Sequence, residues 1–379
     1  MTPIPAAVFL LLILSTTATA ATLSSDISAL KAIKSAINPT TIPPYSCLAS
    51  WNFTLDPCSN PHVTHFLCAL SCSANRVTQL TFDPAGYAGT LSPLVSQLTQ
   101  LTTIDLSDNK LSGPIPTSLF SLPNLQTLIL RSNSFSGTLP PIISTLKSIQ
   151  TIDISHNSLS GSLPDTSSSL TLTRLDLSFN KLTGPIPKLP RNLLELALRS
   201  NSLSGFLSNS SFSELTQLEV VELSENSLAG TIPGWFFLQP GLQQVNLANN
   251  KFTCIEISIP IDSDLVAVDA GYNKITGCLS VNFTAYPVMS SLSLRYNELH
   301  GPIPEEYSRK STLRRLFLDG NYLTGMPPKG FFSGKSSVSG SFGDNCLKSC
   351  PTSSELCSKS QKPSSICRRA NGGKVKLKS

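Results

Sequence analysis

The sequence predicts an α/β solenoid: a right-handed superhelix of short repeats, with a parallel sheet on its concave face and disulfide-bearing caps at both ends. Three observations predict this fold. Leucines recur with a period of about 24 residues, an asparagine falls at a fixed place in that period, and eight of the ten cysteines lie near the two ends. One repeat cannot bury its leucines alone, so stacked turns must share a continuous core.

The first twenty residues have the pattern of a secretory signal peptide. An apolar run from Ala6 to Leu14 is followed by small residues, and Ala18 and Ala20 form an A-x-A cleavage pattern. The apolar run is too short for a membrane anchor, which must cross roughly 30 Å of hydrocarbon. The pattern predicts cleavage near Ala21 and a secreted chain, and the cysteine content fits an oxidising compartment.

Residues 21–76 are predicted to form the N-terminal cap. The stretch from 24 to 39 reads as a helix that begins at Ser25 or Asp26 and is ended by Pro39. One face of it carries Ile27, Leu30, Ile33 and Ile37. Trp51 follows and is placed to cover the open end of the core. The cap cysteines are Cys47, Cys58, Cys68 and Cys72, and four cysteines allow three pairings, among which spacing does not choose.

Residues 77–336 are predicted to form eleven repeats of the pattern L-x-x-L-x-L-x-x-N-x-L-x-G-x-[IL]-P. In a short strand, Leu128 and Leu130 point inward while Ile129 points outward. The repeated Asn, turned inward, can pair its amide with backbone groups of neighbouring turns. The Gly supplies a turn that a β-carbon would crowd, and the Pro stiffens an edge that needs no donor.

The eighth repeat departs from this pattern at "LANNKFTCIEISIP". Cys254 occupies the place that Gly holds in the other ten repeats, and Cys278 lies one position later in the next repeat. Stacked turns would bring their α-carbons within the roughly 4.4–6.8 Å that a disulfide spans, and the closed loop would contribute about 3 kcal/mol. A reactive thiol is the alternative, but the sequence places no base beside it. We therefore expect a Cys254–Cys278 disulfide.

Residues 337–379 are predicted to form a C-terminal cap with a basic tail. The cap cysteines are Cys346, Cys350, Cys357 and Cys367, with their pairing open. From Cys346 onward, eight Lys or Arg residues stand against Glu355 alone. This tail can contact an acidic wall polymer or a membrane surface, or it can be a solvated disordered segment.

Segments such as "LTTIDLSDNKLSGPIPTSLFSLPN" (101–124) resemble the plant extracellular leucine-rich-repeat family, over roughly residues 77–330. The preceding region resembles that family's N-terminal cap. The family's usual Cys-Trp-Gly-Val-Cys run is replaced here by "CSNPHVTHFLCALSC", which leaves the cap's disulfide pairing open. The family includes receptor kinases, receptor-like proteins and polygalacturonase inhibitors, so the resemblance alone does not choose a function.

The sequence favours recognition over catalysis. It lacks G-x-S-x-G and H-E-x-x-H motifs and the kinase signatures of related receptors. His62 and His65 have no third ligand at useful spacing, so we expect no metal site, no cofactor and no enzyme activity. A nucleic-acid partner is not expected either.

Candidate binding residues are the aromatic and arginine departures from the repeat pattern on the concave side or its edge. These residue types dominate binding energy at protein interfaces. They are Arg131, Phe179, Arg199, Tyr272, Arg295, Tyr296, Arg315 and Phe317. Asp153 and Asp176 also point outward but match the repeat consensus. Three glycosylation sequons, at Asn52, Asn209 and Asn282, fall in the cap or on the convex return, which leaves the concave sheet open.

These features predict a secreted plant recognition protein of receptor-like type, which binds a protein or peptide partner on its concave face. By resemblance it would act in the apoplast or cell wall, or peripherally at the plasma membrane, in cell-surface signalling or defence, with a membrane receptor kinase ectodomain as a possible partner. The main alternative is an inhibitor of a secreted wall-degrading enzyme such as polygalacturonase. A structural wall protein held by the basic tail is a third interpretation.

Overall fold

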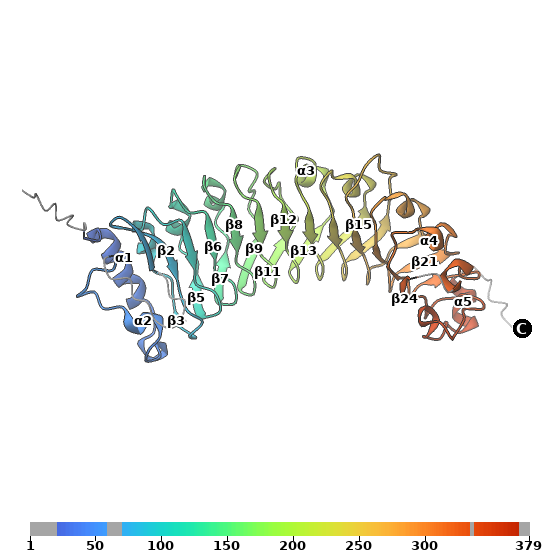
Figure 1. The fold of residues 1–379 in the computed structure, drawn as a ribbon, viewed down its shortest axis with the longest axis horizontal. Coiled ribbons are helices and arrows are strands. Elements are labelled where there is room, and N and C mark those ends of the chain that lie inside the picture. Colours follow the sequence, from blue (N-terminus) through green and yellow to red (C-terminus); the bar gives the residue numbers. More distant parts are fainter. Residues whose placement is uncertain (1–20, 59–69, 334–336, 371–379) are drawn as a thin grey trace, which may run out of the picture.

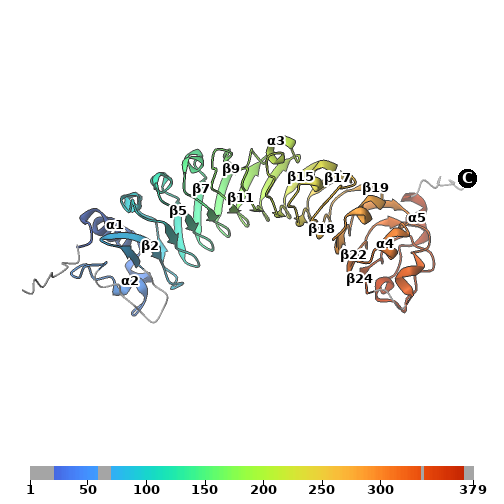
Figure 2. The same ribbon diagram turned by 45° about the horizontal axis from the view of Figure 1, so that its top comes forward.

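The computed structural model describes residues 21–58, 70–333 and 337–370, and the stacked coils follow an arc with a cap at each end (Figures 1 and 2). The predicted signal peptide, His62, His65, Cys68 and the last nine residues of the basic tail lie outside the described residues. The division of the chain into signal, cap, repeat and tail segments therefore stays a prediction, although the repeat architecture itself is confirmed.

The concave face is one long sheet, with thirteen strands within the described residues. Its strands, in spatial order, are β1 (Leu70–Ser73), β2 (Arg76–Thr81), β4 (Thr103–Asp105), β6 (Thr127–Ile129), β8 (Thr151–Asp153), β10 (Arg174–Asp176), β12 (Glu195–Ala197), β14 (Val220–Glu222), β16 (Gln244–Asn246), β18 (Ala267–Asp269), β20 (Ser291–Ser293), β22 (Arg315–Phe317) and β24 (Ser339–Ser341). β1 pairs antiparallel with β2, and the others run parallel, with the central aliphatic residue of one strand beside that of the next from β2 to β22. Those central side chains are buried, as the period-2 pattern predicts.

Shorter strands line the second edge of the coils. They form one sheet of β3 (Ala88–Gly89), β5 (Lys110–Pro114), β7 (Ser134–Thr138), β9 (Ser158–Ser162), β11 (Lys181–Gly184), β13 (Ser202–Gly205), β15 (Ser227–Ile232) and β17 (Lys251–Ile255), and a separate sheet of β19 (Thr276–Cys278), β21 (Glu298–Gly301) and β23 (Tyr322–Leu323). The edge is therefore interrupted between β17 and β19, next to the coil whose sequence breaks the repeat pattern.

The convex return carries mostly single turns of helix. The α-helices are α1 (Ser24–Ser35), α2 (Cys47–Ser50), α3 (Asn209–Phe212), α4 (Glu306–Arg309) and α5 (Ser364–Ala370). The 3₁₀ turns are η1 (Pro39–Thr41), η2 (Pro93–Gln97), η3 (Thr117–Ser121), η4 (Pro141–Thr145), η5 (Gly234–Leu238), η6 (Val281–Ala285), η7 (Lys329–Phe332) and η8 (Glu355–Cys357).

The repeated asparagine forms the predicted interior ladder. In a typical rung, the Asn297 amide donates to the Ala270 and Leu294 carbonyls at 2.9 and 3.1 Å, and its oxygen accepts the Ile275 N–H at 2.9 Å. The ladder continues to Asn345, one coil beyond the eleven repeats that the sequence predicts, and β24 extends the concave sheet with it. The solenoid therefore runs further into the C-terminal segment than expected.

The N-terminal cap is joined to the first repeat by its helix. Leu30 and Ile33 are buried as predicted, and Trp51 covers the end of the core against Phe82. The helix ends at Ser35, four residues before Pro39. The cause is tertiary: Thr90 N–H bonds to the Ala36 carbonyl, so the chain leaves the helix to pair with the first coil.

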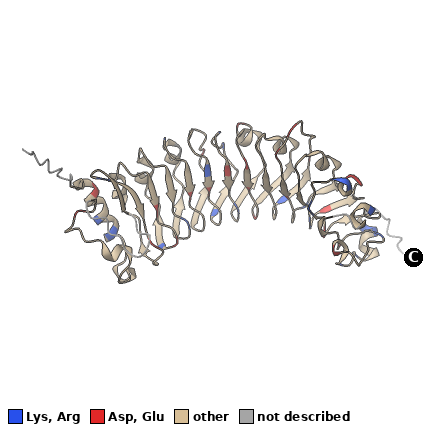
Figure 3. Ribbon diagram, in the orientation of Figure 1, with Lys and Arg blue, Asp and Glu red and all other residues tan. Residues whose placement is uncertain are grey.

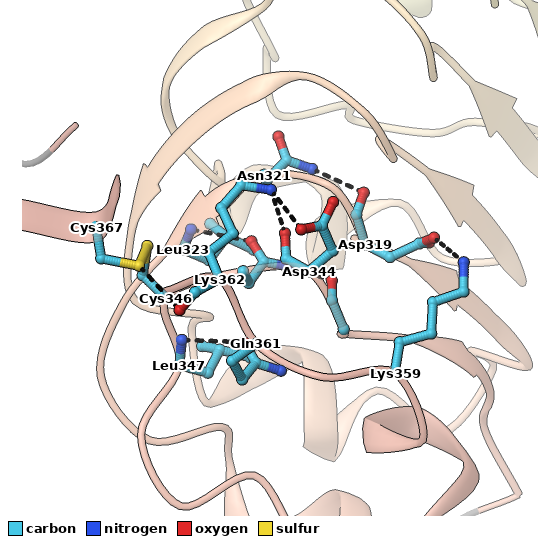
Figure 4. Close-up of polar contacts among 12 residues, drawn as sticks. Asp319, Asn321, Leu323, Asp344, Cys346, Leu347, Lys359, Gln361, Lys362 and Cys367 are labelled. Carbon is cyan, nitrogen blue, oxygen red and sulfur yellow. Dashed lines mark hydrogen bonds and ion pairs between the residues drawn. A yellow bond between two sulfur atoms is a disulfide. The ribbon is translucent and has the colours of Figure 1, made fainter. Parts of the chain in front are cut away.

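Three disulfides close the caps within the described residues. Cys58 pairs with Cys72 in the N-terminal cap, and Cys346–Cys367 and Cys350–Cys357 hold the C-terminal cap. The C-terminal cap also packs polar side chains against the last coils (Figure 4). There Lys362 contacts the Asp344 carboxylate at 2.9 Å.

The predicted Cys254–Cys278 disulfide is wrong, because both cysteines are free thiols. Cys254 lies on β17, which ends the longer edge sheet, while Cys278 lies on β19, which begins the separate one. The Cys278 sulfur points to the following coil, 3.2 Å from where a β-carbon on Gly301 would stand. The chain around Cys254 stays extended through Ile255 without the left-handed turn found at Gly230, so a residue with a β-carbon fits there.

Alkylation of the native, unreduced protein tests this correction. We expect iodoacetamide to modify Cys278 first, because it is exposed, and then the half-buried Cys254. Peptides that contain Cys346 or Cys350 serve as internal controls, since they should react only after reduction. Recovery of a Cys254–Cys278 cross-linked peptide would show that the sequence-based pairing was right.

Candidate interaction face

A hollow of about 350 Å³ lies on the concave sheet over β14 to β22. The outward residues of these strands form it because neighbouring strands carry small side chains there, including Ala267 and Ser291. The lining residues are Val220, Val221, Glu222, Gln244, Val245, Asn246, Ala267, Val268, Asp269, Ser291, Ser293, Arg295, Arg315 and Phe317. The hollow therefore combines an apolar and amide-bearing floor with charged groups.

Arg295 is held in a fixed position at one end of this hollow. Its guanidinium carbon lies 4.3 Å from the centre of the Phe317 ring, and its Nε is 3.5 Å from the fully buried Asp319 carboxylate. Gly271 makes room for it, since a β-carbon there would stand 2.9 Å from Arg295 Cγ. Such stacking orders the side chain before any partner arrives, which lowers the entropy cost of binding.

Asp319 is shared with the C-terminal cap. Lys359 approaches from forty residues further along the chain and donates to Asp319 at 3.0 Å (Figure 4). The hydrogen bond and charge of Asp319 raise the pKa of Lys359 above its ordinary value. Because Lys359 takes one carboxylate oxygen, Asp319 is neutralised from both sides, and Arg295 keeps only a long contact to it.

The rim of the sheet carries bulky residues in a strained backbone conformation. Phe179, Tyr272 and Tyr296 have φ values of 55°, 56° and 51°, which lie in the left-handed region. In the coil after that of Tyr296, the same position is occupied by Gly320. A bulky residue there costs of order 1 kcal/mol or more. The same position is left-handed in the other coils too, for example at Ser132 and Glu225, so the conformation belongs to the repeat turn and these residues are distinguished by their size.

These rim residues fall into two groups. Tyr272 and Tyr296 stack with ring centres 4.7 Å apart, beside the hollow, and Lys359 lies 5.8 Å from the Tyr296 ring. Further towards the N-terminus, His156 stacks on Phe179 at 4.1 Å.

The second rim group continues through charged residues. Arg199 lies 5.4 Å over the Phe179 ring and bonds to Glu225 at 2.6 Å. Glu225 also accepts a hydrogen bond from Ser200. The bond from Ser200, and then that from Arg199, lower the pKa of the Glu225 carboxyl below its ordinary value.

The structure thus brings five of the eight predicted binding residues to one end of the face: Tyr272, Arg295, Tyr296, Arg315 and Phe317. Phe179 and Arg199 form the separate rim group, and Arg131 stands apart, paired with Asp108 at 3.2 Å. The small floor residues Ala267 and Ser291 could not be identified from the sequence, because a small residue at the third position of a repeat does not by itself indicate a hollow. The sequence analysis also missed Lys359, which comes from the cap.

The concave face is acidic nearer its middle. Burial raises the pKa of Asp176 despite a hydrogen bond from Ser178, with Asp153 and Glu195 nearby adding to the increase. Asp153 accepts hydrogen bonds from Ser155, which supports its interpretation as repeat scaffold. Charged residues are otherwise spread thinly over the coils (Figure 3).

The sequons leave this face open. Asn52 and Asn209 are exposed, in the cap and at the start of α3, and the half-buried Asn282 begins η6 on the convex return. Across residues 21–58, 70–333 and 337–370, we find neither a group of three acidic, His or Cys residues placed to hold a metal nor a helix long and apolar enough to cross a membrane.

Family models match most of the repeat region. A leucine rich repeat model matches residues 123–182 and 191–252, a second one matches 100–122, and a leucine rich repeat N-terminal domain model matches 23–64. Receptor like protein 27 of Arabidopsis thaliana is 36% identical over 152 residues, which cover 38% of this chain and 18% of that protein. The matched parts span less than a fifth of the length of that protein and of two further Arabidopsis thaliana relatives, the calmodulin-binding receptor kinase CaMRLK and Receptor-like protein 7.

Two solved structures are similar over most of the chain. The complex of PEPR1 with AtPEP1 has a TM-score of 0.70 at 25% identity, covering 86% of this chain and 49% of that one. The plant peptide hormone receptor RGFR1 in complex with RGF2 has a TM-score of 0.61 at 26% identity, covering 71% of this chain and 48% of that one. Together with the disulfide-bonded caps, these relatives indicate an extracellular or cell-surface location.

Proposed function

Because the chain is a leucine-rich-repeat protein of the plant extracellular type, we propose that it is a receptor-like recognition protein that binds an extended peptide across β14 to β22. The observation that carries the proposal is the hollow on these strands, with the ordered Arg295 at one end. PEPR1 was solved with AtPEP1, and the plant peptide hormone receptor RGFR1 was solved in complex with RGF2. Similarity to these two structures supports a peptide as occupant.

The dimensions of the hollow suit a short extended segment. Five parallel strands spaced about 4.8 Å apart cover about 19 Å, the length of about six extended residues. The Gln244 and Asn246 amides offer donors and acceptors to a peptide backbone.

The charges of the hollow give a bound peptide a direction. Glu222 lies on the first strand of the group, β14, and Asp269 on the middle strand, β18, whereas Arg295 and Arg315 lie towards the C-terminal end. A peptide with an acidic group facing the two arginines and a basic group facing the carboxylates would be favoured in one orientation. Electrostatic complementarity of this kind selects partners and fixes their register.

We place this recognition in the apoplast or at the plasma membrane, in signalling or defence, with a receptor kinase ectodomain as the second partner. The match to Receptor like protein 27 covers 18% of that protein, so the other parts of such an assembly lie outside the matched region. An inhibitor of a secreted wall-degrading enzyme is the alternative, and the acidic strip around Asp153 and Asp176 is the surface that it would use. Contact of the basic tail with an acidic wall polymer remains a further prediction.

Variant-dependent capture tests the proposal. The full chain, tagged and secreted from plant cells, is used to capture partners from apoplastic and membrane extracts. Arg295→Ala and Phe317→Ala should each weaken binding of the specific partner about 30-fold, because they remove a pre-ordered central anchor. Affinities are measured with the purified partner.

Arg174→Ala is the matched control, since its side chain is 64% exposed on the same sheet and, among the described residues, forms an ion pair with Glu195, whose side chain is 46% exposed. Its affinity should equal that of the wild-type protein. If all three variants bind equally, the hollow is not the binding site. If the partner is a hydrolase and its inhibition is lost in Asp153→Lys with Asp176→Lys, the inhibitor interpretation replaces ours.

A further inference from the structure

The irregular coil after β17 exposes two isoleucines on the convex side. The stretch Ile257–Ile261 follows the place of the G-x-I-P turn and stands where the preceding coil has the 3₁₀ turn η5, but no helical turn forms there. Ile259 is 65% exposed, and Ile261 is fully exposed. Two aliphatic side chains flanking one proline in solvent form a local apolar patch, which a secreted protein normally covers.

The sequon asparagine of the next coil contacts this same stretch. Asn282 Nδ2 donates to the Ile257 carbonyl at 2.8 Å, and the Tyr286 hydroxyl donates to the Ser258 carbonyl at 3.0 Å. These two bonds hold the backbone of the stretch directly against η6. Ile259 is only two residues from Ile257, so its α-carbon lies at most about 7 Å from that of Ile257.

The hydrogen bond of Asn282 also sets the direction of any attached sugar. An amide nitrogen carries two substituent positions in one plane, and the Ile257 carbonyl engages one N–H. Glycosylation replaces one of the two hydrogens, and the bond is kept when the sugar takes the hydrogen that faces away from the Ile257 carbonyl. The direction in which the first sugar projects from the Asn282 nitrogen would then be set by the hydrogen bond between that nitrogen and the Ile257 carbonyl.

We propose that Asn282 carries an N-glycan whose first sugars pack on Ile259 and Ile261 and cover the patch. N-acetylglucosamine offers the matching chemistry, because its acetyl methyl group and the C–H faces of its ring are apolar while its hydroxyls face water. The glycan thus shields the coil in which Cys254 replaces the turn glycine. This role does not depend on a ligand in the concave hollow.

The test uses the full chain secreted from eukaryotic cells. Mass spectrometry should find a glycan on Asn282, and enzymatic removal from the folded protein should raise the emission of a dye that binds exposed apolar surface. Thr284→Ala, which abolishes the sequon, should raise it as well. Thr284→Ser is the matched control, because it keeps the sequon, and its dye emission should equal that of the wild-type protein.

Two further variants assign the effect to the isoleucines. In an Ile259→Ser, Ile261→Ser background, removal of the glycan should no longer change dye emission. Asn209→Gln, which removes the sequon at α3, should leave the patch covered. An unoccupied Asn282 overturns the proposal, as does an occupied one whose removal leaves dye emission unchanged. If Asn282 is bare and the serine variants abolish self-association or partner capture, the patch is a docking surface instead.

Discussion

Asp26→Ala is expected to lower the free energy of unfolding of the N-terminal coils by about 3 kcal/mol. Asp26 is fully buried at the start of α1 and bonds to Arg76 Nε and Nη2, each at 3.0 Å, and to the Val77 N–H at 2.9 Å. These three bonds join the cap to the first strand of the concave sheet. Removing the carboxylate leaves the Val77 N–H without its partner in a buried place. It also takes two bonds from the mostly buried Arg76 guanidinium, which keeps its bond to Thr99, and these losses are costlier than loss of the pair itself.

Urea unfolding and hydrogen exchange measure this effect. The exchange of β2 amides should accelerate most, because a solenoid unfolds from the end whose cap is weakened. Glu195→Ala is the control: it removes one partner of an ion pair whose side chains are 64% and 46% exposed, and exposed pairs contribute little. Equal stability losses in the two variants would show that the Asp26 contacts do not join the cap to the repeats.

Asn297→Ala is expected to destabilise the C-terminal coils by about 3 kcal/mol, because it breaks one rung of the interior ladder. The variant leaves the buried Ile275 N–H unpaired and removes one of the two amide donors to each of the Ala270 and Leu294 carbonyls, which keep Asn273 and Asn321. The unpaired N–H costs about 1–3 kcal/mol and each lost carbonyl bond about 1 kcal/mol, and partial relaxation or water entry reduces the sum. The loss is read as a lower urea midpoint and faster exchange at β18 and β20.

Asn124→Ala is the matched control for the ladder. Asn124 is half-buried, and within the described part of the chain its amide makes exposed hydrogen bonds to the Thr99 carbonyl and the Gln100 side chain. Its loss should change stability by less than about 0.5 kcal/mol. A ladder variant as stable as this control would mean that the leucine core alone holds neighbouring coils together.

Much of the fold could be predicted from the sequence because the repeat carries its instructions locally. The buried Leu128, the ladder asparagines and the turn glycines recur in register, and each makes its contact with the neighbouring coil about 24 residues away. Stacking therefore follows from the period. The prediction failed where one coil departs from that pattern, since the fate of Cys254 depended on whether the edge sheet continued to β19.

The candidate site was predictable only in part, for a related reason. The sequence indicates which residues face outward, such as Arg295 and Phe317, because the period-2 pattern of the strand determines the face. It does not indicate which of them gather, and three of the eight lie elsewhere.

The sequence by itself thus determined the repeat, its concave sheet and the identity of the outward residues, since these depend on contacts at one short, constant separation. The tertiary structure decided the free thiols, the position of the hollow and the end of the cap helix. Lys359 reaches Asp319 across forty residues, and only the packing of the C-terminal cap on the last coils sets that contact. Long-range contacts of this kind have no period, so one sequence leaves them open.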